Sequence, residues 1–324
     1  MKHSTREKYL GNLVDKSGSN KVNIEARQAK GYGIVTNILA IINEIPLSHW
    51  RVEAGLRLRQ ALFVNGCLFN SEAWHGVKIT DIKLLEKVDE SLLRGILNAH
   101  SKIPVEALYL ETGSVPIRYI ISSRRLVKED KELINLEISE EDIKSMKKAK
   151  FRTIVRRKMR DAAYKSLNQV KENHSKINGL TYDKLEQTAY LSSPMFNTDS
   201  RKLLIALRTR TVKNIRNDFR GMFPDNKCLL SCGNTDTLQH VLECSVLRRH
   251  HISQNITSSG VRYTDVFSIN IKTQKQATQL YSELLEIREN LTSQTVWTRA
   301  QSLDQCKSLA VLSLSDIYGD AFGN

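Results

Sequence analysis

Residues 81–97, DIKLLEKVDESLLRGIL, decide the fold class of this chain. Leu85, Val88, Leu92 and Ile96 recur at intervals of three and four residues, which places them on one face of an α-helix. Most of the other positions are charged or polar, as on the solvent face of an amphipathic helix. The stretch therefore predicts a helix with one buried face, and similar patterns on both sides of it predict a mainly α protein.

On the N-terminal side, the sequence predicts a small β-hairpin followed by a helix. The hairpin is expected within residues 7–22, with a loose turn at 16–20 and a second strand that begins at Val22. The helix is expected to start with Asn23 as its N-cap, because asparagine is a favoured capping residue. It should stop before Pro46, since the residue that precedes a proline disfavours helical backbone.

Short helices are expected on either side of residues 81–97. Ser48 is a suitable cap for one that ends at the dipeptide Asn65-Gly66. Its expected face carries Val52, Leu56, Arg59 and Phe63. Pro104 and Pro116 each suit the first turn of a further helix, and Gly113 suits the end of the first of these.

Three longer helices are predicted in the second half of the chain. A capping box at Ser139–Asp142 opens the first, whose apolar positions are Ile143, Met146, Ile154, Val155 and Met159. The second covers 199–220 and buries Leu203, Leu204, Leu207, Thr211, Ile215 and Phe219. The third covers 272–291, with Leu280, Leu284, Ile287 and Leu291 in phase.

The 324 residues carry a formal net charge of +14, which favours a polyanionic partner over a basic protein without one. The first residues, MKHSTREKYLG, lack the apolar region of a secretory signal. The longest apolar run, Gly33–Ile45, is interrupted by polar residues and is too short to cross a bilayer. We therefore expect an intracellular protein, nuclear or cytoplasmic, with reduced thiols and no membrane partner.

The most specific local pattern is Cys228-x3-Cys232-x7-His240-x3-Cys244. Three cysteines and one histidine form a common closed ligand set for structural zinc. His240 and Cys244 are four residues apart, so they share one face of a helix. The pattern predicts one zinc ion with no position left for a catalytic water, whereas the alternative is a group of buried reduced cysteines beside a surface histidine.

The residues around this pattern support a turn that faces a helix. Asp236 is a good N-cap, and Gln239 stands where a capping box requires it. Glu243, His250 and His251 are further donors nearby.

Two basic segments are candidate nucleic-acid contacts, because rows of cations can neutralise phosphates and release counterions. The first segment contains Lys147, Lys148, Lys150, Arg152, Arg156, Arg157, Lys158 and Arg160. The second contains Arg201, Lys202, Arg208, Arg210, Lys213, Arg216 and Arg220. The alternative interpretation is two solvated helix faces.

We expect no catalytic residues. Polymerase chemistry needs paired carboxylates that hold two metal ions. The acidic runs Glu129-Asp130 and Glu140-Glu141-Asp142 lie in charged, helical surroundings that favour a solvated surface. Pro224-Asp225 has no Glu-x-Lys companion nearby, and the sequence contains no Gly-x4-Gly-Lys phosphate loop. The sequence therefore predicts neither an enzyme nor a small-molecule substrate.

Long blocks of the chain resemble the C-terminal part of LINE-type (non-LTR) retrotransposon reverse transcriptases. Lys8-Tyr9-Leu10-Gly11 resembles the element at the palm and thumb junction of that family, and LRLRQALFVNGCLFNSEAW at 56–74 is similar to its thumb helix. The blocks at 84–97 and 104–126 are similar to the family's segments directly after the thumb. HSKINGLTYDKLEQTAYL at 174–191, LLIALRTRTVKNIRNDF at 203–219 and the Cys3His segment are similar to the linker and zinc knuckle.

The resemblance implies a helical thumb and linker bundle with an N-terminal hairpin and a zinc knuckle. It covers about residues 7–291. The implied segments are a palm-edge remnant at 1–22, a thumb-like region at 23–127, a basic linker at 128–221, the knuckle at 222–250 and a helical tail at 251–324.

Three departures from the family pattern shape the functional expectation. The family's catalytic palm would precede residue 1. The family has a longer segment between the positions of Arg125-Leu126 and Glu137 than this chain has, which indicates a deletion. The first two cysteines of the knuckle are separated by three residues, where two are commoner in the family. The resemblance therefore implies a truncated element copy that binds RNA or DNA through its basic helices and zinc knuckle, without a polymerase site of its own. The alternative is a domesticated module that binds nucleic acid or another protein.

Overall fold

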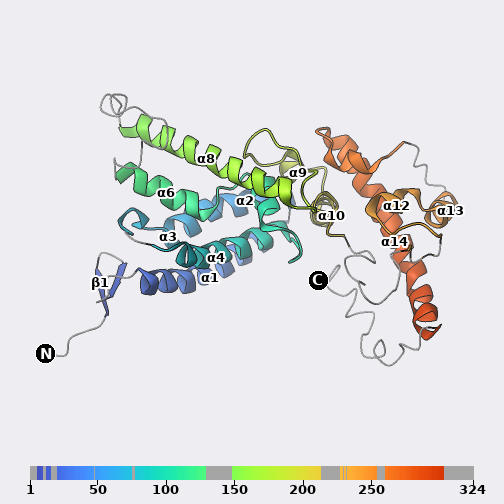
Figure 1. The fold of residues 1–324 in the computed structure, drawn as a ribbon, viewed down its shortest axis with the longest axis horizontal. Helices are drawn as coiled ribbons and strands as arrows, with labels where there is room; N and C mark the ends of the chain where they lie inside the picture. Colours follow the sequence, from blue (N-terminus) through green and yellow to red (C-terminus); the bar gives the residue numbers. More distant parts are fainter. Residues whose placement is uncertain are drawn as a thin grey trace. The chain divides into compact units, whose positions relative to one another are not determined.

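The computed structural model describes residues 6–9, 12–15, 20–46, 48–74, 77–128, 148–212, 227–228, 230, 232–253 and 260–302. The chain is mainly helical, as predicted, and it divides into two compact units, Met1–Thr209 and Arg210–Asn324 (Figure 1). Among the described residues, none of the helices is both long enough and apolar enough to cross a membrane.

The first unit contains two short strands and a set of helices (Figure 1). The strands are β1 (Arg6–Tyr9) and β2 (Asn12–Asp15). The longer helices are α1 (Lys21–Asn43), α2 (Ser48–Leu58), α4 (Ile79–Leu97), α6 (Ile117–Lys128) and α8 (Lys148–Asn173). Shorter pieces are the π-helical turn η1 (Arg59–Val64), α3 (Asn65–Cys67), the 3-10 turn η2 (Ser71–Ala73), α5 (Val105–Thr112), α9 (Ala189–Ser192) and α10 (Thr198–Arg208).

The two strands pair antiparallel, with Arg6 opposite Asp15 and Tyr9 opposite Asn12. The paired strands therefore lie within residues 6–15, and residues 16–19 of the predicted turn lie outside the described residues. Val22, expected in a strand, lies inside α1.

The N-cap of α1 is Asn20, so Asn23 is not the cap that we predicted. Asn23 is buried in the first turn, where its Oδ1 accepts a hydrogen bond of 3.2 Å from the backbone N–H of Leu13. Arg27, one turn later, donates to Asn12 Oδ1 at 3.0 Å and to the Gly66 carbonyl at 3.1 Å. These polar residues attach strand β2 to α1.

Helices α1 and α4 lie side by side in the first unit, and α8 lies on the opposite side of it from α1 (Figure 1). The predicted apolar face of α4 is confirmed, since its residues Leu85, Val88, Leu92 and Ile96 are all buried. Gly95 allows α1 to approach closely, because a Cβ at this position would lie only 2.5 Å from Leu39 Cδ2.

The stop predicted at Asn65-Gly66 is one residue early, because both residues are helical and the helix ends at Cys67. The helical path that begins in α2 continues through η1 and α3 to Cys67. The chain changes direction near Asn70, whose φ is +57°. Local composition suggested a stop, whereas packing keeps this segment helical: Phe63, Val64 and Cys67 are all fully buried.

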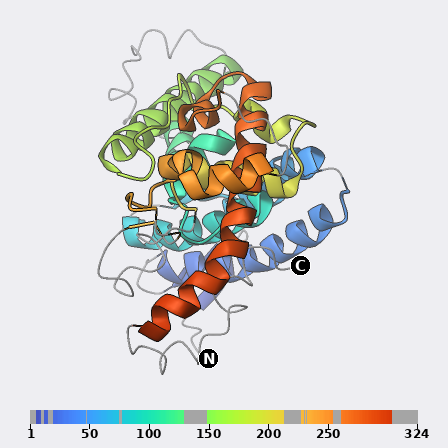
Figure 2. The same cartoon turned by 90° about the vertical axis from the view of Figure 1, so that its right-hand side faces the viewer.

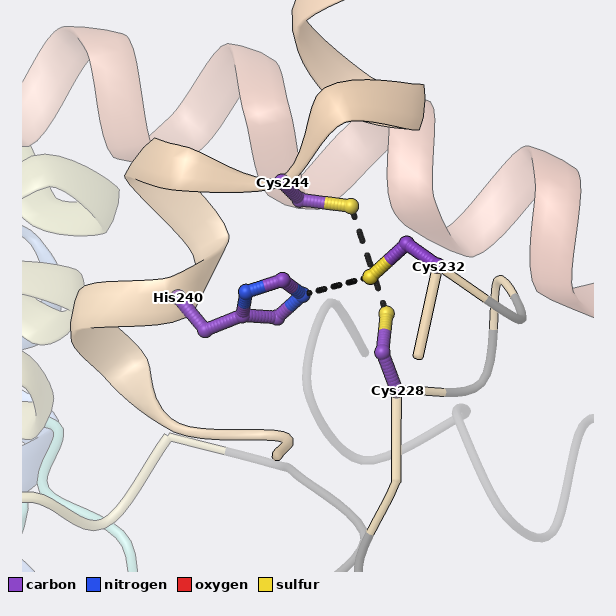
Figure 3. A group of neighbouring side chains, drawn as sticks. All are labelled: Cys228, Cys232, His240 and Cys244. Atoms are coloured by element: carbon purple, nitrogen blue, oxygen red, sulfur yellow. Dashed lines mark hydrogen bonds between the residues drawn. The ribbon is translucent and has the colours of Figure 1, made fainter. Parts of the chain in front are cut away.

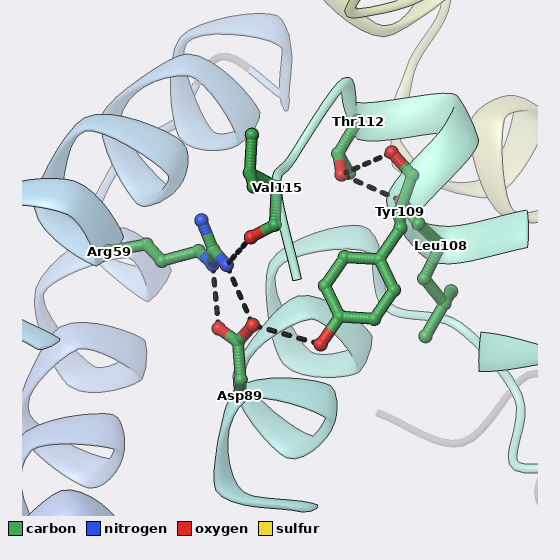
Figure 4. A network of polar contacts seen from close by, with 6 residues as sticks. All are labelled: Arg59, Asp89, Leu108, Tyr109, Thr112 and Val115. Atoms are coloured by element: carbon green, nitrogen blue, oxygen red, sulfur yellow. Dashed lines mark hydrogen bonds and ion pairs between the residues drawn. The ribbon is translucent and has the colours of Figure 1, made fainter. Parts of the chain in front are cut away.

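Arg59 lies on the predicted inner face of this segment because a buried carboxylate matches its charge (Figure 4). Its Nε and one terminal nitrogen donate to the two carboxylate oxygens of Asp89 in α4, both at 2.6 Å. The same guanidinium donates to the Val115 carbonyl at 3.0 Å, and Tyr109 Oη donates to Asp89 at 3.0 Å. The network ties η1 to α4, to α5 and to the link that precedes α6.

The two proline-initiated helices form as predicted. Pro104 precedes α5, and Gly113 ends it with a φ of +63°. A Cβ at Gly113 would lie 2.3 Å from the Glu186 backbone, so glycine is needed for both conformation and space. Helix α6 then packs against α8 through Leu126, Phe151, Val155 and Met159. The capping box at Ser139–Asp142, with Ile143 and Met146, lies outside the described residues.

The helix predicted at 199–220 is shorter than expected. Helix α10 is capped by Asn197, whose Oδ1 accepts from Ser200 N at 2.8 Å, and it ends at Arg208. Leu204 and Leu207 are buried as predicted, and Leu203 is half-buried. Thr211 is buried but lies beyond the helix, and Ile215 and Phe219 lie outside the described residues.

The second unit contains α12 (Leu238–Glu243), α13 (Ser245–Ser253), the 3-10 turn η4 (Tyr263–Phe267) and α14 (Ile271–Ser302). In Figure 2 the long helix α14, in orange to red, is crossed by the shorter α12 and α13. The predicted face of α14 packs as expected at Leu280 and Leu284, which are buried. The predicted segment boundary at 127/128 lies within the first unit and that at 250/251 within the second.

We expect the Arg59–Asp89 pair to be essential for the stability of the first unit. Asp89→Ala should lower the free energy of unfolding by about 3–5 kcal/mol, because it leaves a buried guanidinium unpaired. Tyr109→Phe removes one hydrogen bond to a charged group and should cost about 1.5–3 kcal/mol. Urea denaturation followed by circular dichroism measures both.

The control is Glu53→Gln, which breaks the exposed pair between Glu53 and Arg57. This change should cost less than about 1 kcal/mol. Equal losses for Asp89→Ala and Glu53→Gln would contradict the role that we assign to the buried pair.

Candidate functional site

A tight turn in the second unit places the first two cysteines of the Cys3His pattern. Cys228 N donates to the Asn234 carbonyl at 2.8 Å, and Lys227 pairs with Thr235 in an isolated antiparallel bridge. Gly233, with a φ of +86°, lies within this turn. The return of the chain brings Cys232 back toward Cys228.

Helix α12 places the other two residues. Its N-cap is Thr237, whose Oγ1 accepts from His240 N at 3.0 Å, so the predicted cap at Asp236 is wrong by one residue. Gln239 donates to Glu243 at 2.9 Å, one turn further along the helix. Cys244 follows the last residue of α12.

The four side chains point toward one another (Figure 3). Cys232 Sγ lies 3.1 Å from His240 Nε2, and Cys228 Sγ lies 4.0 Å from Cys244 Sγ. One donor atom from each residue falls within 4.8 Å of all the others. A tetrahedral ion about 2.3 Å from each sulfur separates two sulfurs by roughly 3.8 Å. The four residues therefore lie close enough together to bind one metal ion, as the sequence predicted.

The cluster is shielded from solvent, and a hydrogen bond joins two of its thiols. Cys228, His240 and Cys244 are buried, and Cys232 is half-buried. The hydrogen bond between the two thiols lowers the pKa of Cys244 and raises the pKa of Cys228. Such a cluster supplies a thiolate, the form of cysteine that binds metals. Glu243 and His250, the further donors considered from sequence, are exposed and do not belong to the cluster.

Helix α14 supports this site through two buried polar contacts. Arg288 donates to Asp236 at 2.7 Å, in an ion pair whose side chains are 7% and 1% exposed. Tyr281 Oη donates to the Leu238 carbonyl at 3.1 Å. Sequence reasoning missed both contacts, because Arg288 lies 52 residues from its partner.

The first basic segment lies in part on an exposed surface. Lys150, Arg152, Arg156 and Arg157 are exposed on α8, and Arg160 is also exposed on the same helix. Lys148 begins α8, whereas Lys147 lies outside the described residues. The structure thus presents a basic row along α8.

The prediction for the second basic segment is wrong at Arg201 and Arg208, which are buried. Arg208 donates to Glu111 at 2.7 Å, and its guanidinium lies 5.7 Å from the ring centre of Tyr190. Arg201 donates to the Tyr190 carbonyl at 3.3 Å, and burial lowers its pKa to about 10. Both residues hold α10 in place and are not presented to a phosphate group.

Other predicted residues are only partly described. Arg210 is exposed and has a φ of +51°. Lys213, Arg216 and Arg220 lie outside the described residues. Of the expected junction element, Lys8 and Tyr9 lie in β1, whereas Leu10 and Gly11 are not described.

Comparisons with protein-family models, with curated proteins and with solved structures found no match to this chain.

We expect the four clustered residues to act as a single metal site. Cys244→Ser and His240→Ala should each abolish stoichiometric metal binding, because a tetrahedral site needs all four donors. Mass spectrometry under native conditions measures the bound metal.

The matched control is Cys67→Ala. Cys67 is a buried cysteine of the first unit, and burial raises its pKa to about 11, so its thiol stays protonated. This variant should keep the full metal content. If it loses as much metal as Cys244→Ser, metal binding does not depend on the clustered donors.

Proposed function

We propose that this protein binds nucleic acid without a polymerase site of its own, and that one structural zinc ion holds its C-terminal unit together. The observation that carries the proposal is the convergence of the Cys3His donors into a group that spans no more than 4.8 Å. A closed site of this kind is typical of small modules that are organised by zinc and present a surface to a partner.

The donor set and its surroundings support zinc as the metal. Three thiols and an imidazole are soft or borderline ligands, which favour zinc over magnesium or calcium. The segment between Gly221 and Cys244 has few apolar residues, so packing alone stabilises it little. Zinc would supply the missing free energy, on the order of 10 kcal/mol in zinc-finger peptides.

The basic row on α8 supports nucleic acid as the partner. Helix α8 contains nine lysines and arginines but only two acidic residues, Asp161 and Glu172. This excess of positive charge on one helix adds to the net charge of +14 that the whole chain carries. Phosphate groups along a nucleic-acid backbone are the polyanion that such a row fits best.

The resemblance to LINE-type reverse transcriptases supports the same proposal. It rests on the long blocks at 56–74, 104–126 and 203–219 and on the Cys3His segment. In that interpretation, the chain corresponds to the thumb, linker and zinc-knuckle region. It would bind a nucleic-acid strand without catalysing a reaction on it.

A second candidate is a domesticated protein-interaction module. Exposed apolar side chains on the first unit favour it, among them Trp50 at 61% and Phe69 at 56% exposure. Such residues are enriched in protein interfaces. This candidate predicts binding to a protein partner that depends little on salt.

We expect the purified chain to contain one zinc ion. Removing the zinc with a chelator should unfold the C-terminal unit and lower the helix content measured by circular dichroism. The reason is that the turn that carries Cys228 and Cys232 then lacks the metal ion that stabilises it. Zinc affinity should fall as the pH is lowered, because thiols must lose their protons to bind the metal. Elemental analysis without stoichiometric zinc, or an unchanged spectrum after chelation, would exclude this structural role.

We also expect salt-sensitive binding to nucleic acid. Changing Lys150, Arg152, Arg156 and Arg157 of α8 to Gln should weaken binding of a fluorescent oligonucleotide at least tenfold, because phosphate contacts are lost. The control changes Lys83 and Lys87 of α4, which are also exposed, to Gln. If the wild-type chain shows no binding, or its affinity is the same at 50 and 200 mM salt, nucleic acid is not the partner.

A further inference from the structure

A cleft of about 920 Å³ opens within the first unit. Its walls come from α2 and η1 on one side, from the Thr112–Val115 link and α6, and from α8. Six arginines and only one acidic residue, Glu53, line it. The basic row of α8 therefore continues into a concave site, a feature that the sequence did not predict.

Two of these arginines are matched by carboxylates. Arg59 pairs with Asp89 beneath the cleft, and Arg57 pairs with Glu53 at 2.6 Å. The other arginines of the lining are Arg124, Arg156, Arg157 and Arg160. Their charges give the cleft its positive potential.

Two of these four are held in place by neutral oxygen atoms. Arg124 donates to the Leu68 carbonyl and, at 3.1 Å, to Asn65 Oδ1. Arg160 donates to the Gly113 carbonyl at 3.1 Å and to the Leu185 carbonyl. Carbonyl and amide acceptors fix a guanidinium without cancelling its charge, so both residues are preorganised for an anion.

The charges are also crowded. Burial lowers the pKa of Arg124; Glu72 opposes this shift, and the nearby charge of Arg156 adds to it. Two like charges close together in a half-buried site repel each other, and an anion bound between them relieves this repulsion. Arg156 and Arg157 are exposed on α8 at the same rim.

The rest of the lining is uncharged and mixes apolar with amide groups. The half-buried Tyr119 and Met159 offer apolar faces, and Gln60 and Gln187 offer donors and acceptors. Aromatic and apolar faces stack with bases, while amides can hydrogen-bond to base edges.

We infer that this cleft binds a single strand of nucleic acid, with phosphates on Arg124, Arg156, Arg157 and Arg160 and a base against Tyr119. The inference rests on the proposed nucleic-acid function and assigns its strand type and location. A duplex hides its base faces and would contact only the arginine rim. A cleft at the upper end of the usual size range for small-ligand pockets has room for a short stretch of strand rather than a double helix.

The test uses the full chain and a fluorescein-labelled 12-nucleotide oligothymidine in anisotropy titrations. Arg156→Gln with Arg157→Gln should weaken binding at least tenfold and lower the salt slope by about 1.4, from 0.7 per lost phosphate contact on a single strand. The matched control is Lys83→Gln with Lys87→Gln, on exposed positions of α4 outside the cleft lining. This pair should change affinity less than threefold.

Tyr119→Leu separates stacking from charge. It should weaken binding about fivefold or more, since a stacked base contributes about 1–3 kcal/mol, and it should leave the salt slope unchanged. Circular dichroism confirms that each variant keeps the wild-type helix content. If Tyr119 has only a structural role, Tyr119→Leu should lower the melting temperature and should not weaken binding at an unchanged salt slope.

The outcomes separate the two proposals. If the wild-type chain binds no oligonucleotide, the proposed function fails and the cleft inference fails with it. If the chain binds but the cleft pair and the matched pair weaken binding equally, the loss reflects overall charge and only the cleft inference is overturned. The cleft inference is also overturned if a 12-base-pair duplex binds as tightly as the oligothymidine and loses as much affinity in the Arg156→Gln, Arg157→Gln variant. It is likewise overturned if ATP competes for the chain as well as unlabelled oligothymidine does.

Discussion

The ion pair between Arg59 and Asp89 is the constraint on which the first unit depends (Figure 4). Two opposite charges taken out of water are tolerated only when their geometry and remaining hydrogen bonds are good. Tyr109 and the Val115 carbonyl complete that geometry, so η1, α4 and α5 must meet in one register. The link at Thr112–Val115, which carries the chain from α5 into α6, contains the Val115 carbonyl that Arg59 contacts. The ion pair thereby positions η1 against this link, and both line the basic cleft.

Arginines serve two different purposes in this unit, and burial separates them. Arg208 pairs with Glu111 of α5 and lies against the Tyr190 ring, and Arg201 donates to the Tyr190 carbonyl of α9. These contacts hold α10 against α5 and α9. Arg156 and Arg157 remain exposed on α8. A surplus of positive charge therefore stabilises the fold at some positions and remains available to a polyanion at others.

In the second unit, the Cys3His cluster and the long helix α14 support each other. Arg288 and Tyr281 reach from α14 to the residues that flank the ligand helix α12. The buried ion pair to Asp236 places the first turn of α12, where Thr237 caps the helix and orients His240. A metal ion at the cluster would therefore organise more of the chain than its four ligands.

By itself, the sequence determined the helical class, the buried face of α4 and the identity of the four clustered residues. These properties follow from local spacing: a 3.6-residue period selects a helix face, and a cysteine–histidine pattern selects donors that a turn and a helix bring together. Only the tertiary structure decided which strands pair, that Asn65-Gly66 stays helical, and which arginines are buried. Arg208 and Glu111 are 97 residues apart, and no local pattern records that a carboxylate lies there. The basic cleft depends on the same long-range packing, because its walls come from segments that are distant in the chain.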